Sequence, residues 1–434
     1  MSKIIYLLIA LSCRQVCLAQ SEQRQFWALN GSFAGYTWDN TSGNNRTDNG
    51  SGTWNTVTGN WSINNGVTNR LWQAGAAAIF GGNPGTGAAG TVTVSGTQTA
   101  QSLAFNSSAS GNFTLTGGTI TNTSGAITAN ASATINSTIG GSSGLTLAGT
   151  ATLTIGGTTT YTGTTTVNSG TLVLANGIAN STVPSLTTAV SIASGATLAA
   201  DITGNINLSG NISGPGTLSL INAGGQTMRL YGDNSGFTGN FSEPSTTRGM
   251  MWSDNGGAGN AANTGSAAAS WDLSGSFGFI ETAAAATPTV QLGSLSGSNS
   301  ATTIGGFSGS GTKTLQIGAL STNTTFAGAI QDNPQATGTP VIALIKVGTG
   351  TQTLSGTNTY SGTTTVNAGT LAFTTAVPSS VTWNIAVNAT SAPTSAGSGL
   401  ITLPASPGLF GKTVNIVLTG SSTGFTWQDR KSVV

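Results

Sequence analysis

The 434-residue sequence has no histidine and very little charge, with 12 Lys+Arg and 11 Asp+Glu making up 5% of the chain. An ordinary globular domain contains about 25% charged residues. The absence of histidine excludes a histidine general base, a Ser-His-Asp or Cys-His catalytic arrangement, and a zinc site built on histidine. The formal net charge of +1 argues against a nucleic-acid-binding protein, because such proteins carry a basic surface.

Cysteine is almost absent as well, since Cys13 and Cys17 both lie in the first twenty residues. This N-terminal stretch has a basic start and an apolar run over residues 4–11, too short to span a bilayer, which takes about 20 residues. It predicts a secretory signal peptide over residues 1–19; a lipoprotein signal ending at Cys13 and a buried N-terminal strand are the alternatives. Cleavage would leave 12 − 2 = 10 basic and 11 acidic groups and no thiol, so disulfides could not stabilise the mature chain.

Two stretches of the chain closely repeat each other. Residues 147–174 read LAGTATLTIGGTTTYTGTTTVNSGTLVL and residues 346–373 read KVGTGTQTLSGTNTYSGTTTVNAGTLAF, with 17 identities in 28 gapless positions. A weaker copy spans residues 214–241, in which Asn234 matches Asn358 once one residue is inserted before Phe237. Self-similarity of this kind indicates a repeat architecture.

Within each copy, the apolar residues alternate with a period of two, which is typical of β-strands. In the second copy Thr364 and Val366 share one face, and Leu371 and Phe373 are predicted to point inward. Glycine and asparagine recur where turns are expected. The unit continues for about 300 residues, longer than most sandwiches or barrels. The sequence therefore predicts an all-β parallel β-helix, a solenoid with coils of about 20–24 residues whose strands pair with their equivalents in the next coil.

The string Tyr-x-Gly-Thr-Thr-Thr-Val-Asn-x-Gly-Thr-Leu occurs in both close copies. It resembles the autotransporter-associated β-strand repeat, the passenger-associated transport repeat of large bacterial secreted proteins. Counted generously, the likeness covers residues 37–373. The resemblance implies a right-handed β-helical passenger, displayed on or released from the surface of a Gram-negative-type bacterium, and it transfers no catalytic residue to this chain.

The C-terminal part departs from a full autotransporter. After the last clear repeat 434 − 373 = 61 residues remain, whereas a membrane β-barrel needs at least about eight strands of 9–11 residues. We therefore expect a passenger portion without a translocator barrel. Three explanations stay open: secretion by another route, a missing sorting tail, or a truncated reading frame. Residues 374–434 are interpreted as the end of the solenoid or a truncated tail.

The N-terminal segment, residues 20–89, is rich in tryptophan and precedes the repeat region at 90–373. One interpretation is a cap, in which bulky aromatic side chains close the open end of the apolar core. The alternative is a surface that stacks on sugar rings, because indole offers a large flat area with a polar N–H. The candidate glycan contacts are Trp38, Trp54, Trp61 and Trp72. We favour the cap.

Other candidate sites rest on less specific patterns. Residues 39–45 and 48–50 offer oxygen atoms to calcium, but they lack the acidic spacing of an EF-hand and suit turns better. Thr-x-Thr arrays such as residues 158–160 suit ordinary β-ladders better than an ice-binding grid. A glycosidase would need a carboxylate pair. The densest group of charged residues that could supply one is Arg229, Asp233, Glu243, Arg248 and Asp254.

These observations predict a non-enzymatic exported protein, structural or adhesive, that is extracellular or on the outer-membrane surface. We expect no cofactor and no metal. The expected partner is extracellular, a glycan or a cell surface, and not nucleic acid. No transmembrane segment is expected in the mature chain, because no later run reaches about 18 apolar residues. The alternative is a polysaccharide-binding or polysaccharide-degrading β-helix enzyme, with carboxylates or basic groups on one face of adjacent coils.

Overall fold

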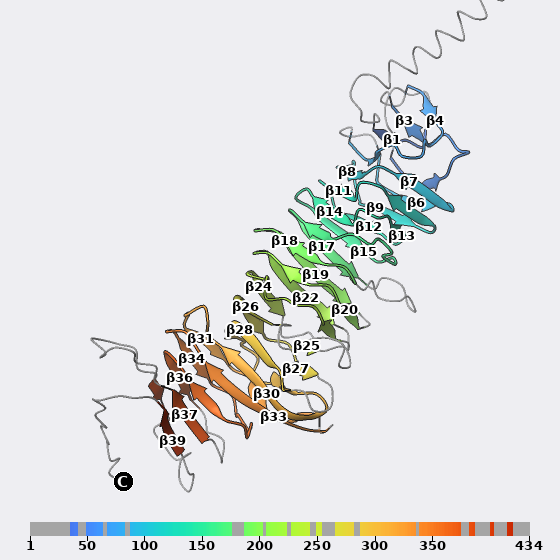
Figure 1. Cartoon of the computed structure of the whole chain (residues 1–434). Coiled ribbons are helices and arrows are strands. Elements are labelled where there is room, and N and C mark those ends of the chain that lie inside the picture. The colour runs from blue at the N-terminus through green and yellow to red at the C-terminus, as the bar shows by residue number, and fades with distance from the viewer. Residues whose placement is uncertain are drawn as a thin grey trace, which may run out of the picture.

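The chain is a stack of short, mostly parallel β-strands in the computed structural model. Figure 1 shows the strands following one another along one long axis, from β1 (Tyr36–Trp38) to β39 (Asn415–Thr419). The described residues form five sheets and no helix, which confirms the predicted all-β parallel β-helix. The structure describes residues 35–41, 49–63, 67–82, 87–175, 186–202, 205–223, 227–243, 249–253, 265–281, 287–335 and 338–374, and the strand backbones of 382–386, 400–402 and 415–419.

The strands are given sheet by sheet in their spatial order. The sixteen-stranded sheet consists of β2 (Gly52–Trp54), β6 (Thr91–Val94), β9 (Phe113–Thr116), β12 (Ala133–Ile135), β15 (Thr152–Ile155), β17 (Thr171–Ala175), β19 (Thr197–Ile202), β22 (Thr217–Ala223), β24 (Asn240–Glu243), β26 (Ser266–Leu273), β28 (Thr289–Ser296), β30 (Ser310–Ile317), β33 (Thr339–Lys346), β35 (Thr364–Val366), β37 (Thr382–Ala386) and β39. The ten-stranded sheet consists of β21 (Ile212–Ser213), β18 (Val190–Ile192), β16 (Thr165–Val167), β14 (Leu145–Ala148), β11 (Ala126–Ala129), β8 (Leu103–Phe105), β5 (Ala78–Phe80), β1, β3 (Trp61–Ser62) and β4 (Asn69–Arg70). The six-stranded sheet consists of β20 (Ile206–Leu208), β23 (Met228–Leu230), β25 (Gly249–Ser253), β27 (Phe277–Glu281), β29 (Thr303–Gly306) and β32 (Ala329–Gln331). The remaining two sheets are β13 (Thr138–Gly140), β10 (Thr119–Asn122) and β7 (Thr97–Ala100), and β31 (Thr324–Phe326), β34 (Thr351–Leu354), β36 (Thr370–Phe373) and β38 (Leu400–Thr402).

Inward residues keep their register from coil to coil. Leu115 pairs with Ile135 and Ile135 pairs with Ile155, so the same inward position recurs at equal steps along the chain. The range of coil lengths predicted from the sequence is too narrow, because Phe241 pairs with Trp271, a step half as long again. Coil length therefore varies between strands, whereas the pairing within the strands is maintained.

Three strands per coil give the solenoid three faces. We call face 1 the row β5, β8, β11, β14, β16, β18 and β21, and face 2 the row β6, β9, β12, β15, β17, β19, β22 and β24. Face 3 begins with β7, β10 and β13 and resumes with β20, β23, β25, β27, β29 and β32. In the interval, single bridges from Ile139 to Thr159 and from Leu186 to Leu208 continue face 3.

Phe237 continues face 1 in the interval between β21 and β26. It forms a parallel bridge with Gly214, which directly follows β21. Its carbonyl oxygen accepts a hydrogen bond from Ser266 Oγ at the start of β26, at 2.6 Å. Phe237 is 1% exposed, so its ring contributes to the core while its backbone links the two strands.

Two long strands then join faces 1 and 2 into one sheet. β26 pairs with β24 of face 2 through its second half, and its register with β28 shifts between Ser266 and Ser270. The first half of β28 pairs with β30, and its second half leads to β31 through the bridge between Gly297 and Phe326. Face 1 therefore continues through β30, β33 and β35, and face 2 through β31, β34 and β36.

The two close copies occupy equivalent places in this arrangement. Each supplies a face 2 strand, a face 1 strand and the next face 2 strand: β15, β16 and β17 in the first copy, and β34, β35 and β36 in the second. The tyrosine of each copy is buried, and its hydroxyl lies 2.8 Å from a threonine Oγ1 on face 1, Tyr161 with Thr165 and Tyr360 with Thr364. Burial raises the pKa of Tyr161 to about 12, and it raises the pKa of Tyr360 as well.

We expect Tyr360→Phe to lower the local free energy of unfolding of this coil by about 1–2 kcal/mol, because a buried hydroxyl loses its partner. Thr364 is only 1% exposed. Native-state hydrogen exchange of residues 351–373 measures the change. Tyr231→Phe, at a partly buried position on another coil, should leave exchange in these residues unaltered. Equal protection in Tyr360→Phe and wild type would contradict a role for the hydroxyl.

The weaker copy, residues 214–241, shares one buried turn with the last repeat. Asn234 Oδ1 accepts a hydrogen bond from Ile212 N at 2.8 Å, and Asn358 Oδ1 accepts one from Ile330 N at 3.0 Å. Both asparagines are 1% exposed. Each accepts a hydrogen bond from a backbone N–H of the preceding coil, at a place where the structure describes no strand of the next coil that could accept it.

Candidate functional site

The four tryptophans predicted as candidate glycan contacts form the N-terminal end of the core. Trp38, Trp54 and Trp61 are 0% exposed and Trp72 is 4% exposed. Trp54 packs edge to face against two of the others: its centroid lies 5.1 Å from that of Trp61 and 4.9 Å from that of Trp72. Because buried indole faces are not available for stacking on an external sugar, this packing supports the cap and lends no support to glycan contact.

The strands at this end reverse direction. β3 pairs antiparallel with β1, and β4 pairs antiparallel with β3, whereas β1 pairs parallel with β5. In the part of the chain that the structure describes, face 1 therefore ends in two strands of two residues each instead of a long parallel edge. Short edge strands limit pairing with other chains, which is the property a cap requires.

The stretch considered for calcium makes the contacts of turns. Asp39 Oδ1 accepts a hydrogen bond from Thr41 N at 3.1 Å, and Asn49 Nδ2 donates to Gly87 O at 3.2 Å. Residues 42–48 lie outside the described residues. Within the described ranges, no group of three or more His, Cys, Asp and Glu is placed to hold a metal ion.

The structure describes three of the charged residues considered for a glycosidase pair, and these three do not share a surface. Arg229 lies on the outside of face 3, Asp233 Oδ1 accepts a backbone hydrogen bond within a turn, and Glu243 is 1% exposed in the core. Arg248 and Asp254 lie outside the residues that the structure describes. Two carboxylates flanking a substrate, the arrangement that glycoside hydrolysis needs, are therefore not formed by Asp233 and Glu243.

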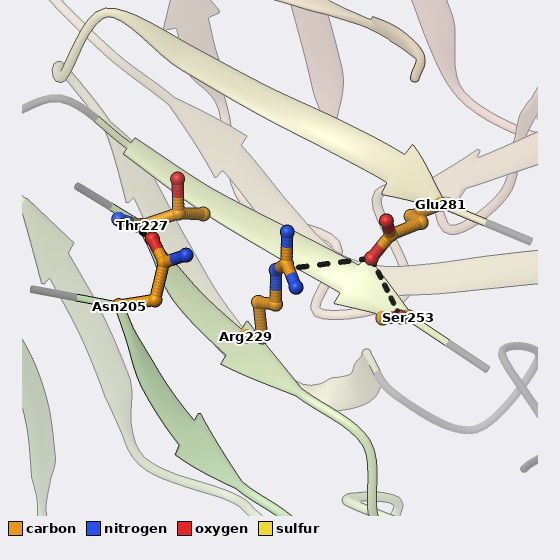
Figure 2. A network of polar contacts seen from close by, with 5 residues as sticks. All are labelled: Asn205, Thr227, Arg229, Ser253 and Glu281. Atoms are coloured by element: carbon orange, nitrogen blue, oxygen red, sulfur yellow. Dashed lines mark hydrogen bonds and ion pairs between the residues drawn. The ribbon is translucent and has the colours of Figure 1, made fainter. Parts of the chain in front are cut away.

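A different polar network crosses three coils on the outside of face 3 (Figure 2). Nε of Arg229 on β23 lies 3.8 Å from Oε2 of Glu281 on β27, and Ser253 Oγ on the intervening β25 donates to the same oxygen at 2.9 Å. Beside them, Asn205 Oδ1 accepts a hydrogen bond from Thr227 N at 3.0 Å. The side chains of Arg229 and Glu281 are 27% and 23% exposed, so the network is partly open to solvent. It offers donors and acceptors to a polar ligand such as a sugar.

Apolar side chains pack beside this network, on the outside of the same sheet. Phe277 and Phe279 stack with ring centroids 4.2 Å apart and planes 7° apart, and Phe307 lies 5.9 Å from Phe279. Met251 belongs to the same cluster and is 1% exposed. β25 and β27 therefore carry apolar side chains on both faces, which is why neither shows the simple alternation of the repeats.

Glu243 and Lys346 are buried titratable residues that were not predicted as such. Glu243 is 1% exposed, and burial raises the pKa of its carboxyl to about 8. Lys346 is 1% exposed and donates to the carbonyl oxygens of Val347, Gly348 and Ala368 at 2.7, 2.8 and 3.3 Å. Burial lowers the pKa of Lys346 to about 8. Both residues occupy inward positions of their strands, which a strict count of the two-residue period would have indicated.

Topology and repeats together define the class of the chain: a parallel β-solenoid built partly from tandemly related coils. The passenger-associated-transport-repeat family matches the chain twice, at residues 145–174 and 344–373. The chain thus contains two of these repeats within a β-solenoid, consistent with an autotransporter passenger. No curated protein and no solved structure gave a match. A helix long and apolar enough to span a membrane is not found in the described ranges.

Proposed function

We propose that this chain is an exported, non-enzymatic passenger with a structural or adhesive role, located outside the cell or on the outer-membrane surface of a Gram-negative-type bacterium. The observation that carries the proposal is the position of both matched repeats within one continuous solenoid. Repeats of this kind occur in passengers. A signal peptide at residues 1–19 would direct export.

The environments of three described carboxylates support a non-enzymatic function. Asp332 Oδ1 accepts hydrogen bonds from Ile342 N and Ser361 N at 2.8 and 3.1 Å, which fixes a turn between coils. Glu281 is bound to Arg229 and Ser253, and Glu243 is enclosed in the core. Asp332 and Glu281 therefore have partners within the protein, and Glu243 is not accessible to a substrate.

Export can be tested by expressing the full chain in a Gram-negative host and fractionating the culture. We expect the chain in the medium or on the cell surface, accessible to added protease, with a mature N-terminus at Gln20 by mass spectrometry. A cytoplasmic chain that keeps Met1 would contradict the proposal.

The alternative function is the recognition or cleavage of a polysaccharide, and the network of Arg229, Ser253 and Glu281 favours it. A glycan array and a reducing-sugar assay, both on the mature chain, separate binding from turnover. If the alternative holds, Arg229→Gln and Glu281→Gln abolish the signal, whereas Arg70→Gln, an exposed arginine of the cap, leaves it intact. Turnover that depends on Glu281 would replace the proposed function.

A further inference from the structure

Glu243 is a buried acid at a junction between coils. The segment Asn240-Phe241-Ser242-Glu243 alternates outward and inward, so the last residue of β24 points into the core. Glu243 is 1% exposed, and its Cα partner on the next coil is Leu273 of β26. Its carboxyl therefore lies where the chain leaves β26 and turns toward β27.

The carboxyl of Glu243 has one hydrogen bond. Its Oε1 accepts from Gly275 N at 3.0 Å, and in the described structure its Oε2 has no hydrogen-bond partner. Among the residues that the structure describes, the charged group that acts on it is Asp272 of β26, a second acid. Neither β22, which pairs with β24 on face 2, nor β25 on face 3 contributes a charged residue. A carboxylate in this setting is much less stable than the neutral acid, because one hydrogen bond does not replace the lost hydration.

We propose that closure of the coil at the junction of β24, β26 and β27 takes up one proton at Glu243, so that the closed coil is most stable in acidic solution and becomes less stable as the pH rises. The direction follows from linkage. Burial, reinforced by Asp272 and opposed by the Gly275 N–H, raises the pKa of Glu243 from 4.5 to about 8. The folded coil therefore binds more protons than the opened coil between these two pKa values, and its stability is lost as the pH rises through this window.

The coil that Glu243 closes bears β25 and β27, which carry the polar network and the outer apolar cluster. Opening the coil would separate Ser253 from Glu281, because they belong to successive strands of face 3. Proton binding at a single core position would thus control the order of the surface region that carries the ion pair of Arg229 and Glu281. This inference is independent of the proposed function.

Hydrogen exchange at a series of pH values, corrected for intrinsic rates, tests the inference on the full chain. For residues 240–243 and 270–281 we expect the equilibrium constant for opening to rise by up to about tenfold per pH unit between about pH 5 and pH 8. In Glu243→Gln, which cannot ionise, the constant should be independent of pH. Glu281→Gln, the matched control on the outer surface, should keep the wild-type slope. A pH-independent wild type, or a slope that persists in Glu243→Gln, would overturn the inference.

A second measurement needs no variant. The sequence contains three glutamates, Glu22, Glu243 and Glu281, so selective ¹³C labelling of glutamate carboxyls gives three signals to titrate. We expect one signal with a midpoint near 8, and it should shift to an ordinary value when the chain is unfolded in denaturant. Three midpoints near the ordinary value in the folded chain would refute proton uptake at Glu243.

Discussion

Trp54→Ala should unfold the N-terminal end of the solenoid, with a loss of about 3–5 kcal/mol in the local free energy of unfolding. Trp54 is 0% exposed and packs against both Trp61 and Trp72, with ring centroids 5.1 and 4.9 Å away. Removing the indole leaves a cavity, because the neighbouring rings are packed in the core and relax only partially into the space. Native-state hydrogen exchange of residues 52–80 measures the loss.

The same substitution should also promote association of the chain. Without its cap, the first coil presents unpaired backbone groups and an apolar end, to which a second solenoid can add strands. Light scattering during storage at constant temperature detects this. Val57→Ala is the matched control, because Val57 is 79% exposed in the same segment and surface substitutions usually change stability by less than about 0.5 kcal/mol. If Trp54→Ala keeps wild-type protection and stays monomeric, the aromatic cluster does not act as a cap.

The repeats could be predicted because their information is local. Alternation predicts Thr364 and Val366 on one face and Leu371 and Phe373 inward, and these four residues are 1%, 1%, 0% and 3% exposed. Threonine at a buried position looks anomalous in isolation. The tyrosine four residues earlier explains it, because the two hydroxyls bond to each other. Strand, turn and partner all lie within about one coil of sequence, so a single-sequence pattern can specify them.

The polar network on face 3 could not be predicted because its geometry depends on coil length. The step along the chain from Ser253 to its Cα partner Glu281 is longer than the step from Leu115 to Ile135. Inserted residues between strands set these separations, and no periodic signal reports how many are inserted. Proximity in the sequence therefore groups Arg229 with the acids near it in the chain, while the structure pairs it with Glu281.

The burial of Glu243 is obscured in the sequence by its charge. A glutamate at a strand end is usually exposed, and the charged residues near it in the chain suggest a shared surface. The alternation through Phe241 nonetheless predicts that Glu243 points inward, and the structure follows the alternation. At Glu243 the two-residue period and the residue type disagree, and the period decides which way the side chain points, because pairing of β24 with β22 and β26 fixes its inward face.

Gly369→Ala should destabilise the second repeat by about 2–5 kcal/mol, since two effects add. Gly369 has φ +67°, a left-handed conformation that disfavours a side chain. A Cβ at this position would also lie 2.4 Å from the carbonyl oxygen of Gly350 and 2.5 Å from that of Gly348, on the coil beneath. The equivalent glycine of the first repeat, Gly170, has φ +70° and a Cβ position 2.6 Å from Ala151 O, so Gly170→Ala should behave alike.

Gly195→Ala separates the two effects. Gly195 has φ +77°, but a Cβ there has no neighbour within 4 Å, so only the conformational strain of about 1–2 kcal/mol applies. Denaturant melts of the three variants, with hydrogen exchange of β17, β19 and β36 to localise each loss, give the comparison. Losses that are larger at positions 170 and 369 than at 195 would assign the repeat glycine to the contact between coils. Equal losses at all three would mean that left-handed backbone alone accounts for the glycine and that successive coils could lie farther apart without a penalty.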